Sequence, residues 1–177
     1  MALTKIPGLI LLPLLVMAGA HASTPNFKRS EAGGTKMDNY ISDGFFAGGE
    51  RSVTAARLKD IRRAMNPRGG YERVVLDLES MGEGAKDAIP YFQVQAAPNE
   101  DRFVVSIWAD VDFDFEPGRI QKTFARSKNV RKVNIVPRVE DGLGIIELLM
   151  SPAKSGQKHK VEAFHLARPN RIILDIL

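Results

Sequence analysis

The chain has no cysteine among its 177 residues, and it has only three histidines and one tryptophan. Without cysteine, no disulfide can staple the fold, no thiolate can bind zinc and no lipid can be attached through a thioether. A domain without disulfides must be stabilised by its apolar core, which about 120 residues of folded chain can supply.

The first 22 residues are typical of a secretory signal peptide. A positive charge at Lys5 precedes an apolar run from Ile6 to Ala20, and the small residues Ala20 and Ala22 are typical of a cleavage site. The run contains two prolines and is shorter than the about 20 apolar residues of a membrane span, so a permanent span is the weaker alternative. We expect cleavage after Ala22 and an exported protein, periplasmic or cell-wall associated.

Residues 23–52 contain glycine pairs and scattered charges without a sustained apolar period, which predicts a flexible leader. The one apolar stretch in this leader is GFFAGG, at residues 44–49. We expect an isolated aromatic pair there, and the alternative is that these aromatics dock onto the domain or onto a partner. The folded domain is expected at residues 53–177.

Two copies of one pattern follow, the first at residues 57–109 and the second at residues 128–177, joined by a connection at residues 110–127. Each copy has an opening strand, a Gly-bearing turn, an alternating strand, a variable loop, a second alternating strand, a Pro-Asn turn and a closing strand. Residues 73–78 and residues 171–176 also share one order: Arg, three aliphatic residues, Asp and one more aliphatic residue.

Alternation of apolar and polar residues predicts β-strands in both copies. In RVVLDL, the side chains of Val74, Leu76 and Leu78 are expected on one face of a strand. Arg73 and Asp77 are expected on the other face. We expect each copy to form a small antiparallel sheet, and the two apolar faces to bury one another. The predicted fold is all-β, a small β-sandwich of two short antiparallel sheets with pseudo-twofold symmetry.

The segment VTAARLKDIRRAM, at residues 53–65, also fits an amphipathic helix through Leu58, Ile61 and Met65. Its alignment with the second copy favours a strand.

Carboxylates alternate with apolar residues in DVDFDFEPG, at residues 110–118. Such carboxylates can bind a hard cation, but calcium loops need a glycine turn and a bidentate glutamate, whereas this alternation is unbroken. We therefore expect a strand that buries Phe113 and Phe115 and guards a sheet edge with its charged face.

Short apolar strands with an Arg and an Asp make up the segments LKDIRRAMNPRGGYERVVLDLE, PYFQVQ, NEDRFVVSIW, VRKVNIVPRVEDGLGIIELLM and FHLARPNRIILDIL. Together these segments resemble the AMIN domain over residues 57–177. AMIN domains occur in bacterial envelope proteins, including N-acetylmuramoyl-L-alanine amidases and type IV pilus secretins, as noncatalytic targeting modules that associate with peptidoglycan. The resemblance implies a sandwich of two small sheets, and it implies peptidoglycan as the partner.

Candidate catalytic groups are few. His159 and His165 remain after signal cleavage, and neither has a Cys, a nearby His or a Glu at metal-ligand spacing. No serine stands in a Gly-x-Ser-x-Gly setting. We expect a noncatalytic protein without a metal or another cofactor.

Basic charge is concentrated in the second half: residues 118–177 carry 12 Lys or Arg against 5 Asp or Glu, whereas residues 23–117 carry 12 against 16. A basic second copy suits an anionic partner such as stem-peptide carboxylates of peptidoglycan, acidic lipid headgroups or another protein. Export, together with the absence of stacking aromatics in the basic part, disfavours nucleic acid. The alternative function is an adaptor subunit of a pilus or secretion assembly that docks through its sheet edges or its leader.

The candidate ligand contacts are arginines on the solvent face of the strands: Arg73, Arg102, Arg131 and Arg171. A guanidinium group can bind a carboxylate through two parallel hydrogen bonds. The alternative is that these arginines only form ion pairs with strand carboxylates such as Asp77 and Asp175.

Overall fold

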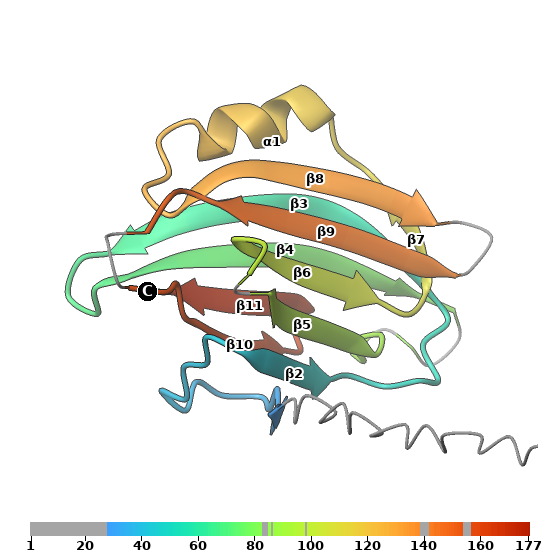
Figure 1. Ribbon diagram of the computed structural model, residues 1–177. Helices are drawn as coiled ribbons and strands as arrows, with labels where there is room; N and C mark the ends of the chain where they lie inside the picture. Colours follow the sequence, from blue (N-terminus) through green and yellow to red (C-terminus); the bar gives the residue numbers. More distant parts are fainter. Residues whose placement is uncertain (1–27, 83–84, 86, 98, 139–141, 154–156) are drawn as a thin grey trace, which may run out of the picture.

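The computed structural model describes residues 28–177, apart from residues 83–84, 86, 98, 139–141 and 154–156. The predicted signal peptide lies outside the described residues. Two β-sheets face one another and one short helix accompanies them, so the predicted all-β sandwich is confirmed (Figure 1).

The six-stranded sheet has the order β1 (Arg29–Glu31), β2 (Gly44–Gly48), β5 (Phe92–Ala97), β6 (Arg102–Ile107), β9 (Leu143–Met150) and β8 (Val130–Arg138). The five-stranded sheet has the order β10 (Val161–Leu166), β11 (Arg171–Ile176), β4 (Tyr71–Met81), β3 (Ala55–Asn66) and β7 (Asp110–Phe113). Pairing is antiparallel except at one edge of each sheet, where β1 is parallel to β2 and β7 is parallel to β3.

The two copies of the repeat correspond strand by strand, β3 to β6 in the first copy and β8 to β11 in the second. Each sheet nevertheless contains strands of both copies, because β6 pairs with β9 and β11 pairs with β4. The expectation that each copy forms its own sheet is therefore wrong: each copy contributes one hairpin to each sheet. The order β5-β6-β9-β8 and the order β10-β11-β4-β3 correspond under exchange of the copies, which is the predicted pseudo-twofold symmetry.

The correspondence extends to the pairing register. Ile61 of β3 lies opposite Leu76 of β4, and the equivalent Val133 of β8 lies opposite Leu148 of β9. All four side chains are buried in one core. The copies are thus equivalent in the residues that they bury as well as in the order of their strands.

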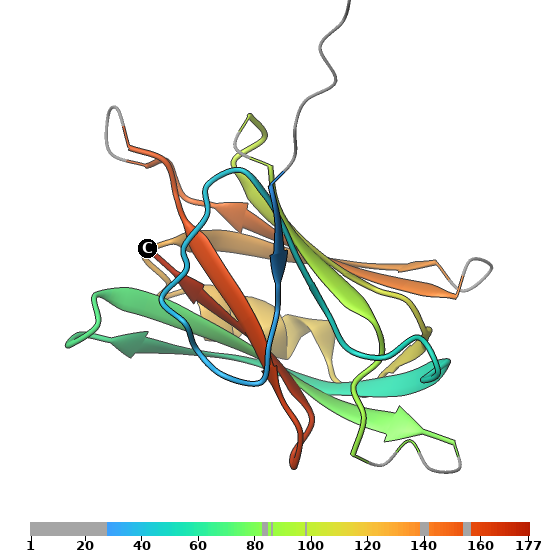
Figure 2. The ribbon, with the colours of Figure 1, turned by 90° about the horizontal axis from the view of Figure 1, so that it is seen from below.

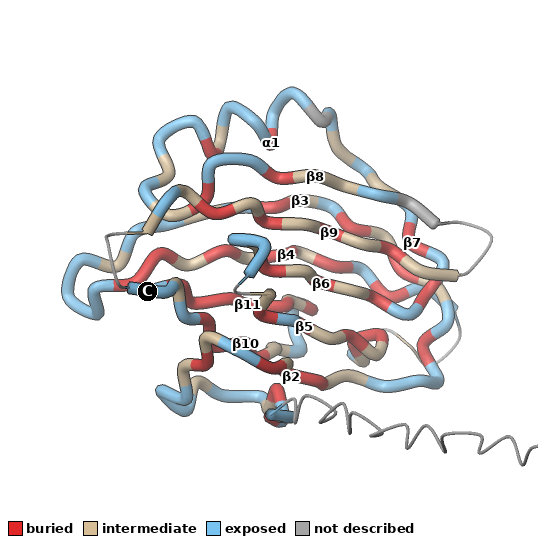
Figure 3. The backbone as a smooth tube through the Cα atoms, viewed as in Figure 1, coloured by how far each residue is buried: buried red, intermediate tan, exposed pale blue. Residues whose placement is uncertain are grey.

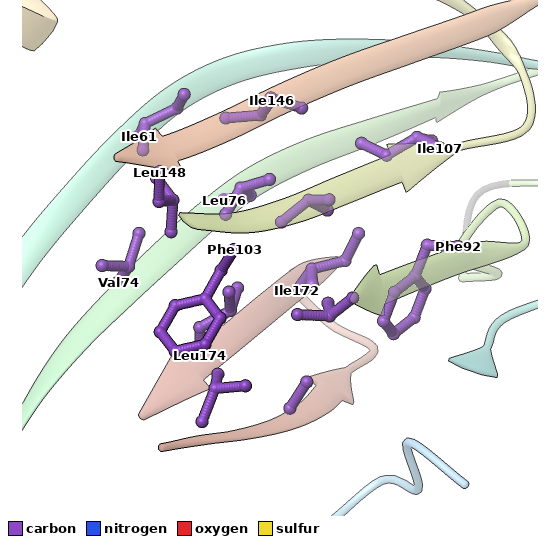
Figure 4. Packing of buried hydrophobic residues seen from close by; sticks show 14 of the residues in the cluster. Ile61, Val74, Leu76, Phe92, Phe103, Ile107, Ile146, Leu148, Ile172 and Leu174 are labelled. Carbon is purple, nitrogen blue, oxygen red and sulfur yellow. The ribbon is translucent and has the colours of Figure 1, made fainter. Parts of the chain in front are cut away.

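Side chains from the facing surfaces of the two sheets form this core. Figure 4 shows Leu76, Ile172 and Leu174 of the five-stranded sheet near Phe103 and Ile107 of the six-stranded sheet. Buried residues alternate with more exposed ones along β4, β6 and β9, as the period of two predicts (Figure 3). Full burial of one such aliphatic side chain contributes about 1.5 to 3 kcal/mol.

The ambiguous segment at residues 53–65 forms most of β3, so the strand interpretation is confirmed. The carboxylate-rich segment follows the expectation in part: β7 is the edge strand of its sheet, with Asp110 and Asp112 exposed, but the strand ends at Phe113 and α1 begins at Pro117. Phe113 and Phe115 pack against the core but remain partly exposed.

The helix α1 (Pro117–Phe124) in the connection between the copies was not predicted from the sequence. Its apolar residues Ile120 and Phe124 are buried in the core between β8 and β3 (Figure 1). Arg63 of β3 donates hydrogen bonds to the carbonyl oxygens of Thr123 and Arg126, each at 3.0 Å, and so satisfies acceptors at the helix end. Eight residues with two apolar positions give too weak a periodicity to identify such a helix from sequence.

The predicted flexible leader is, in its described part, built into the sandwich. GFFAG forms β2, which pairs with β5, and Phe46 is buried in the core. Residues 32–43, which connect β1 to β2, pass along the edge strand β10, where Ile41 and Val161 exchange backbone hydrogen bonds of 2.9 and 2.8 Å (Figure 2). The alternative of docking onto the domain is therefore correct for GFFAGG. A Cβ atom on Gly48 would lie 2.6 Å from the carbonyl oxygen of Ala32, so glycine here permits a close approach of two chain segments.

Candidate functional site

Two crossed Arg–Asp pairs lie on the outer face of the five-stranded sheet. Arg73 lies opposite Asp175, and Arg171 lies opposite Asp77, because β4 and β11 are antiparallel. Arg73 donates from Nε and Nη2 to the two carboxylate oxygens of Asp175, at 2.7 and 2.8 Å. Arg171 donates from Nε to Oδ1 of Asp77 at 3.0 Å. The arginine–aspartate order shared by the two segments thus lets each arginine meet the carboxylate of the neighbouring strand.

Asp77 is also held by Arg62, which donates to it from Nη2 at 2.8 Å. Burial by itself raises the pKa of Asp77, but the hydrogen bonds and charges of Arg62 and Arg171 outweigh burial and lower the pKa below its ordinary value. The hydrogen bonds of Asp175 likewise outweigh burial and raise the pKa of Arg73. Both predicted arginines on this face are therefore charged and already occupied by carboxylates.

The other two predicted arginines lie on the six-stranded sheet. Arg102 donates from Nη1 to Oε1 of Glu147 at 2.5 Å and also forms an ion pair with Glu100. Arg131 is exposed at a β-bulge of β8, and within the described part of the chain no ion pair involves it. The four predicted arginines thus lie on two different sheets, and the structure does not bring them together into one surface.

The N-terminal segment is fastened to the five-stranded sheet by a further charged cluster. Lys36 Nζ lies 2.9 Å from Oε2 of Glu162 and 3.8 Å from Oδ2 of Asp175. The other carboxylate oxygen of Glu162 accepts hydrogen bonds from the backbone N–H groups of Met37 and Asn39, at 2.7 and 3.2 Å. Both carboxylates are buried, so the cluster fixes residues 36–39 against the sheet and presents no free charge to a ligand.

Free cations lie instead around a groove of about 680 Å³ that is lined entirely by residues of the second copy. The lining side chains come from the segment before β8, from the connection between β9 and β10 and from the end of the chain: Lys128, Asn129, Pro152, Ala153, Gln157, Lys158, His159, Lys160 and Leu177.

The frame of this groove is held by backbone hydrogen bonds. Ser151 N–H donates to the carbonyl oxygen of Asn129 at 2.6 Å, and Leu177 N–H donates to the carbonyl oxygen of Lys160 at 2.9 Å. His159 Nε2 lies 2.8 Å from the carbonyl oxygen of Ser151. The three segments that line the groove are therefore tied to one another.

Lys128, Lys158 and Lys160 are exposed, and none of them forms an ion pair with a described residue. Three positive charges at one groove, none of them in an ion pair with a described residue, create a local positive potential, which attracts anions. A lysine ammonium group binds a carboxylate or phosphate oxygen as a point charge with rotatable donors, so the groove can accept anions of varied geometry.

The two histidines contact backbone carbonyl groups. Besides the contact with Ser151, His159 has Nδ1 3.3 Å from the carbonyl oxygen of Leu177, and His165 has Nδ1 2.8 Å from that of Ala32. Among the described residues, no group of three or more His, Asp or Glu side chains could hold a metal ion. The contacts that the structure gives these histidines are ones that join chain segments.

The sequence analysis did not identify the three groove lysines, although it found the excess of basic residues in the second copy. The predicted arginines recur in the strands, where ion pairs with carboxylates of the neighbouring strand are favoured. The lysines lie in connections, whose course the sequence pattern does not determine. The signal in the sequence that points towards them is the basic excess of the second copy.

A scan against protein-family models matches none of them, and searches of curated proteins and of solved structures find no match to this chain. Within the described residues, no helix has the length and apolar character needed to cross a membrane.

Proposed function

We propose that the protein is an exported, noncatalytic module that associates with peptidoglycan in the bacterial cell envelope. The observation that carries the proposal is the groove rimmed by Lys128, Lys158 and Lys160, whose charges have no partner among the described residues. Stem peptides of peptidoglycan carry carboxylates, which are suitable anions for such a groove. The resemblance of residues 57–177 to AMIN domains supports the same function and location.

The binding site in this proposal differs from the arginine face expected from the sequence. Arg73, Arg102 and Arg171 would have to leave carboxylate partners to bind a ligand, and that exchange gains little free energy. Arg131 is the second residue of β8, two positions beyond Asn129 of the groove, and it forms no ion pair with a described residue. Of the four predicted arginines, Arg131 is the one that we retain as a ligand contact.

An adaptor function is the second candidate, because the outer face of the six-stranded sheet carries aliphatic side chains. Val136 lies opposite Ile145 in the β8–β9 pair, and both are at least partly exposed, with Val104 of β6 also partly exposed on that face. A protein partner would cover such side chains. The GFFAGG stretch, in contrast, cannot offer both of its aromatic side chains to a protein partner, since Phe46 is buried in the core.

Co-sedimentation with purified peptidoglycan tests the proposal. The protein from Ser23 onward is expected to pellet at about 20 mM salt and to be released at about 500 mM, because screening weakens contacts between exposed charges. The triple variant Lys128→Gln, Lys158→Gln, Lys160→Gln should bind at least about tenfold more weakly. Peptidoglycan whose carboxylates have been converted to amides should bind the wild type as weakly as native peptidoglycan binds the triple variant.

The matched control is the triple variant Lys59→Gln, Arg68→Gln, Lys122→Gln, which removes the same charge from β3, the turn after it and α1. It should pellet like the wild type, because these residues lie outside the groove. Equal loss of binding in both triple variants would show that only net charge matters and would refute the groove as the site. A folded wild type that stays in the supernatant at low salt would refute wall binding and favour the adaptor function.

A further inference from the structure

A second hollow, of about 450 Å³, lies at the β1–β2 edge of the six-stranded sheet. Its lining consists of Arg29 and Glu31 of β1, the small residues Ala47, Gly48 and Gly49, and the side chain of Tyr91 just before β5. The small residues keep the floor of the hollow close to the backbone. The hollow shares no lining residue with the lysine groove, so it is a separate feature of the molecule.

An aromatic pair forms one wall of this hollow and continues beyond it. The ring centroids of Tyr91 and Trp108 are 5.3 Å apart, and the rings are tilted by 56°. Trp108 is 38% exposed, which is unusual for the largest apolar side chain. Arg51 stacks on Tyr91, with its guanidinium carbon 4.3 Å from the ring centroid. The aromatic surface is thus held in place on one side and open to solvent at Trp108.

Polar groups surround the aromatic pair on the same outer face. Gln93 follows Tyr91 on β5 and donates from Nε2 to the tyrosine hydroxyl at 2.9 Å, which orients the amide. Arg29 and Glu31 are exposed, and neither forms an ion pair with a described residue. The two have opposite charges, so the hollow has little net charge, in contrast with the lysine groove. It offers both donors and acceptors to a neutral ligand.

We propose that this hollow, with Tyr91 and Trp108, binds a neutral oligosaccharide chain. A pyranose ring has an apolar face of C–H groups and an edge of hydroxyl groups. Exposed aromatic rings suit the apolar face, and amide, carboxylate and guanidinium groups beside them suit the hydroxyls. Trp108, whose ring centroid lies 5.3 Å from that of Tyr91, extends the aromatic surface beyond the hollow. This proposal goes beyond the proposed function and does not depend on the lysine groove.

The single tryptophan gives a direct measurement, because tryptophan fluorescence, excited selectively over the three tyrosines, comes from Trp108 alone. The protein from Ser23 onward is titrated with N-acetylchitotetraose, cellotetraose and maltotetraose, each up to about 10 mM, since a weak single site has a Kd near the millimolar range. We expect a saturable shift in emission with at least one of them. High salt should leave this binding unchanged, because the hollow carries little net charge.

Two variants assign the binding to the hollow. Tyr91→Ala removes the aromatic wall, so it should lower the affinity for the saccharide that binds the wild type by at least about tenfold. Tyr91→Phe keeps the ring and loses only the hydroxyl, so its affinity should stay within about threefold of the wild type. Thermal unfolding of each variant checks that the fold is retained. If Tyr91→Ala unfolds, Glu31→Gln and Arg29→Gln, which change exposed side chains of β1, serve in its place and should each weaken binding.

The proposal is overturned if none of the three saccharides changes the emission, or if a saccharide binds equally well to the wild type and to the wall variants. It is also overturned if only a proline-rich peptide, such as decaproline, produces a saturable shift, because extended proline helices bind aromatic hollows as well. Whether the lysine triple variant pellets with peptidoglycan does not bear on these outcomes, so the two proposals can fail separately.

Discussion

Arg73 on β4 binds Asp175 on β11 through two parallel hydrogen bonds, with Nε 2.7 Å from Oδ1 and Nη2 2.8 Å from Oδ2. The carboxylate of Asp175 is fully buried, whereas the arginine side chain is 32% exposed. The pair joins the alternating strand of the first copy to the closing strand of the second. It therefore stabilises the contact that makes one sandwich out of two repeats.

Replacing Arg73 by alanine should lower the free energy of unfolding by about 3 kcal/mol, because a buried carboxylate loses its main partner. Lys36 remains near Asp175, but at 3.8 Å. The comparison is Arg102→Ala, where Glu147 is partly exposed and can regain water, so the loss should be about 1 kcal/mol or less. Urea unfolding of both variants measures the difference. Equal losses would mean that burial of the carboxylate does not determine the strength of the pair.

Acid should weaken the fold partly through Asp77. Its pKa is lowered from the ordinary 3.8, since Arg62 and Arg171 outweigh the effect of burial. The native state then binds fewer protons than the unfolded state in this range, so the stabilisation is present at neutral pH and is lost as the pH falls below about 4. In urea unfolding, the stability difference between wild type and Arg171→Gln should shrink from pH 7 to pH 3. A difference that is the same at both pH values would contradict this account.

Alkaline pH should weaken the attachment of the N-terminal segment. Burial lowers the pKa of Lys36, but its hydrogen bonds to Asp38, Tyr40 and Glu162 outweigh burial and raise the pKa above the ordinary 10.5. Burial raises the pKa of Tyr40 above 10.0, and Lys36 only partly offsets that effect. Both groups keep their protons longer in the native state, so stability should fall as the pH rises above about 10.

Tyrosinate absorbance during a pH titration measures this directly, because the chain has three tyrosines. One tyrosine should titrate at raised pH, and Tyr40→Phe should remove that step. Lys36→Met should move the step to still higher pH, because the lysine charge favours the ionised phenol. A step that moves to lower pH in Lys36→Met would contradict the assigned contact.

Deleting residues 172–177 should unfold the whole domain. β11 lies between β10 and β4 inside the sheet, and Ile172, Leu174 and Ile176 are fully buried. Each of these side chains contributes about 1.5 to 3 kcal/mol, and β10 and β4 would both lose their neighbour. Circular dichroism and a urea titration check the result. Deletion of Leu177 alone, an exposed residue, is the control and should leave a cooperative transition.

Much of the fold was predictable because strand residues alternate between two faces. The residues expected to face the core from β4, namely Val74, Leu76 and Leu78, are buried in the structure. The carboxylates of residues 110–118 indicated the edge strand β7. The helix α1 and the strand β2 were missed, because a short amphipathic segment and a glycine-rich pentapeptide have little intrinsic preference. Contacts with the core, through Phe124 and Phe46, stabilise them instead.

Predictions about the candidate site depended more on tertiary structure. The sequence identified recurring arginines and a basic second copy, but it could not say which cations would be paired. Arg73 and Arg171 pair with carboxylates on the neighbouring strand. Lys158 and Lys160 lie in the connection before β10, and neither forms an ion pair with a described residue. The aromatic wall of Tyr91 and Trp108 was not predicted. The two residues are seventeen positions apart in the chain, and they come together only when β5 and β6 pair.

The sequence by itself determined the repeat, the strands of its two copies and the side chains of these strands that face inward, because these follow from a period of two along a single segment. The tertiary structure alone decided that each copy gives one hairpin to each sheet. It also decided which charges are neutralised and which remain free. Strand pairing and ion pairing join residues far apart in the chain, and local preference does not encode which of several compatible partners lies within hydrogen-bonding distance.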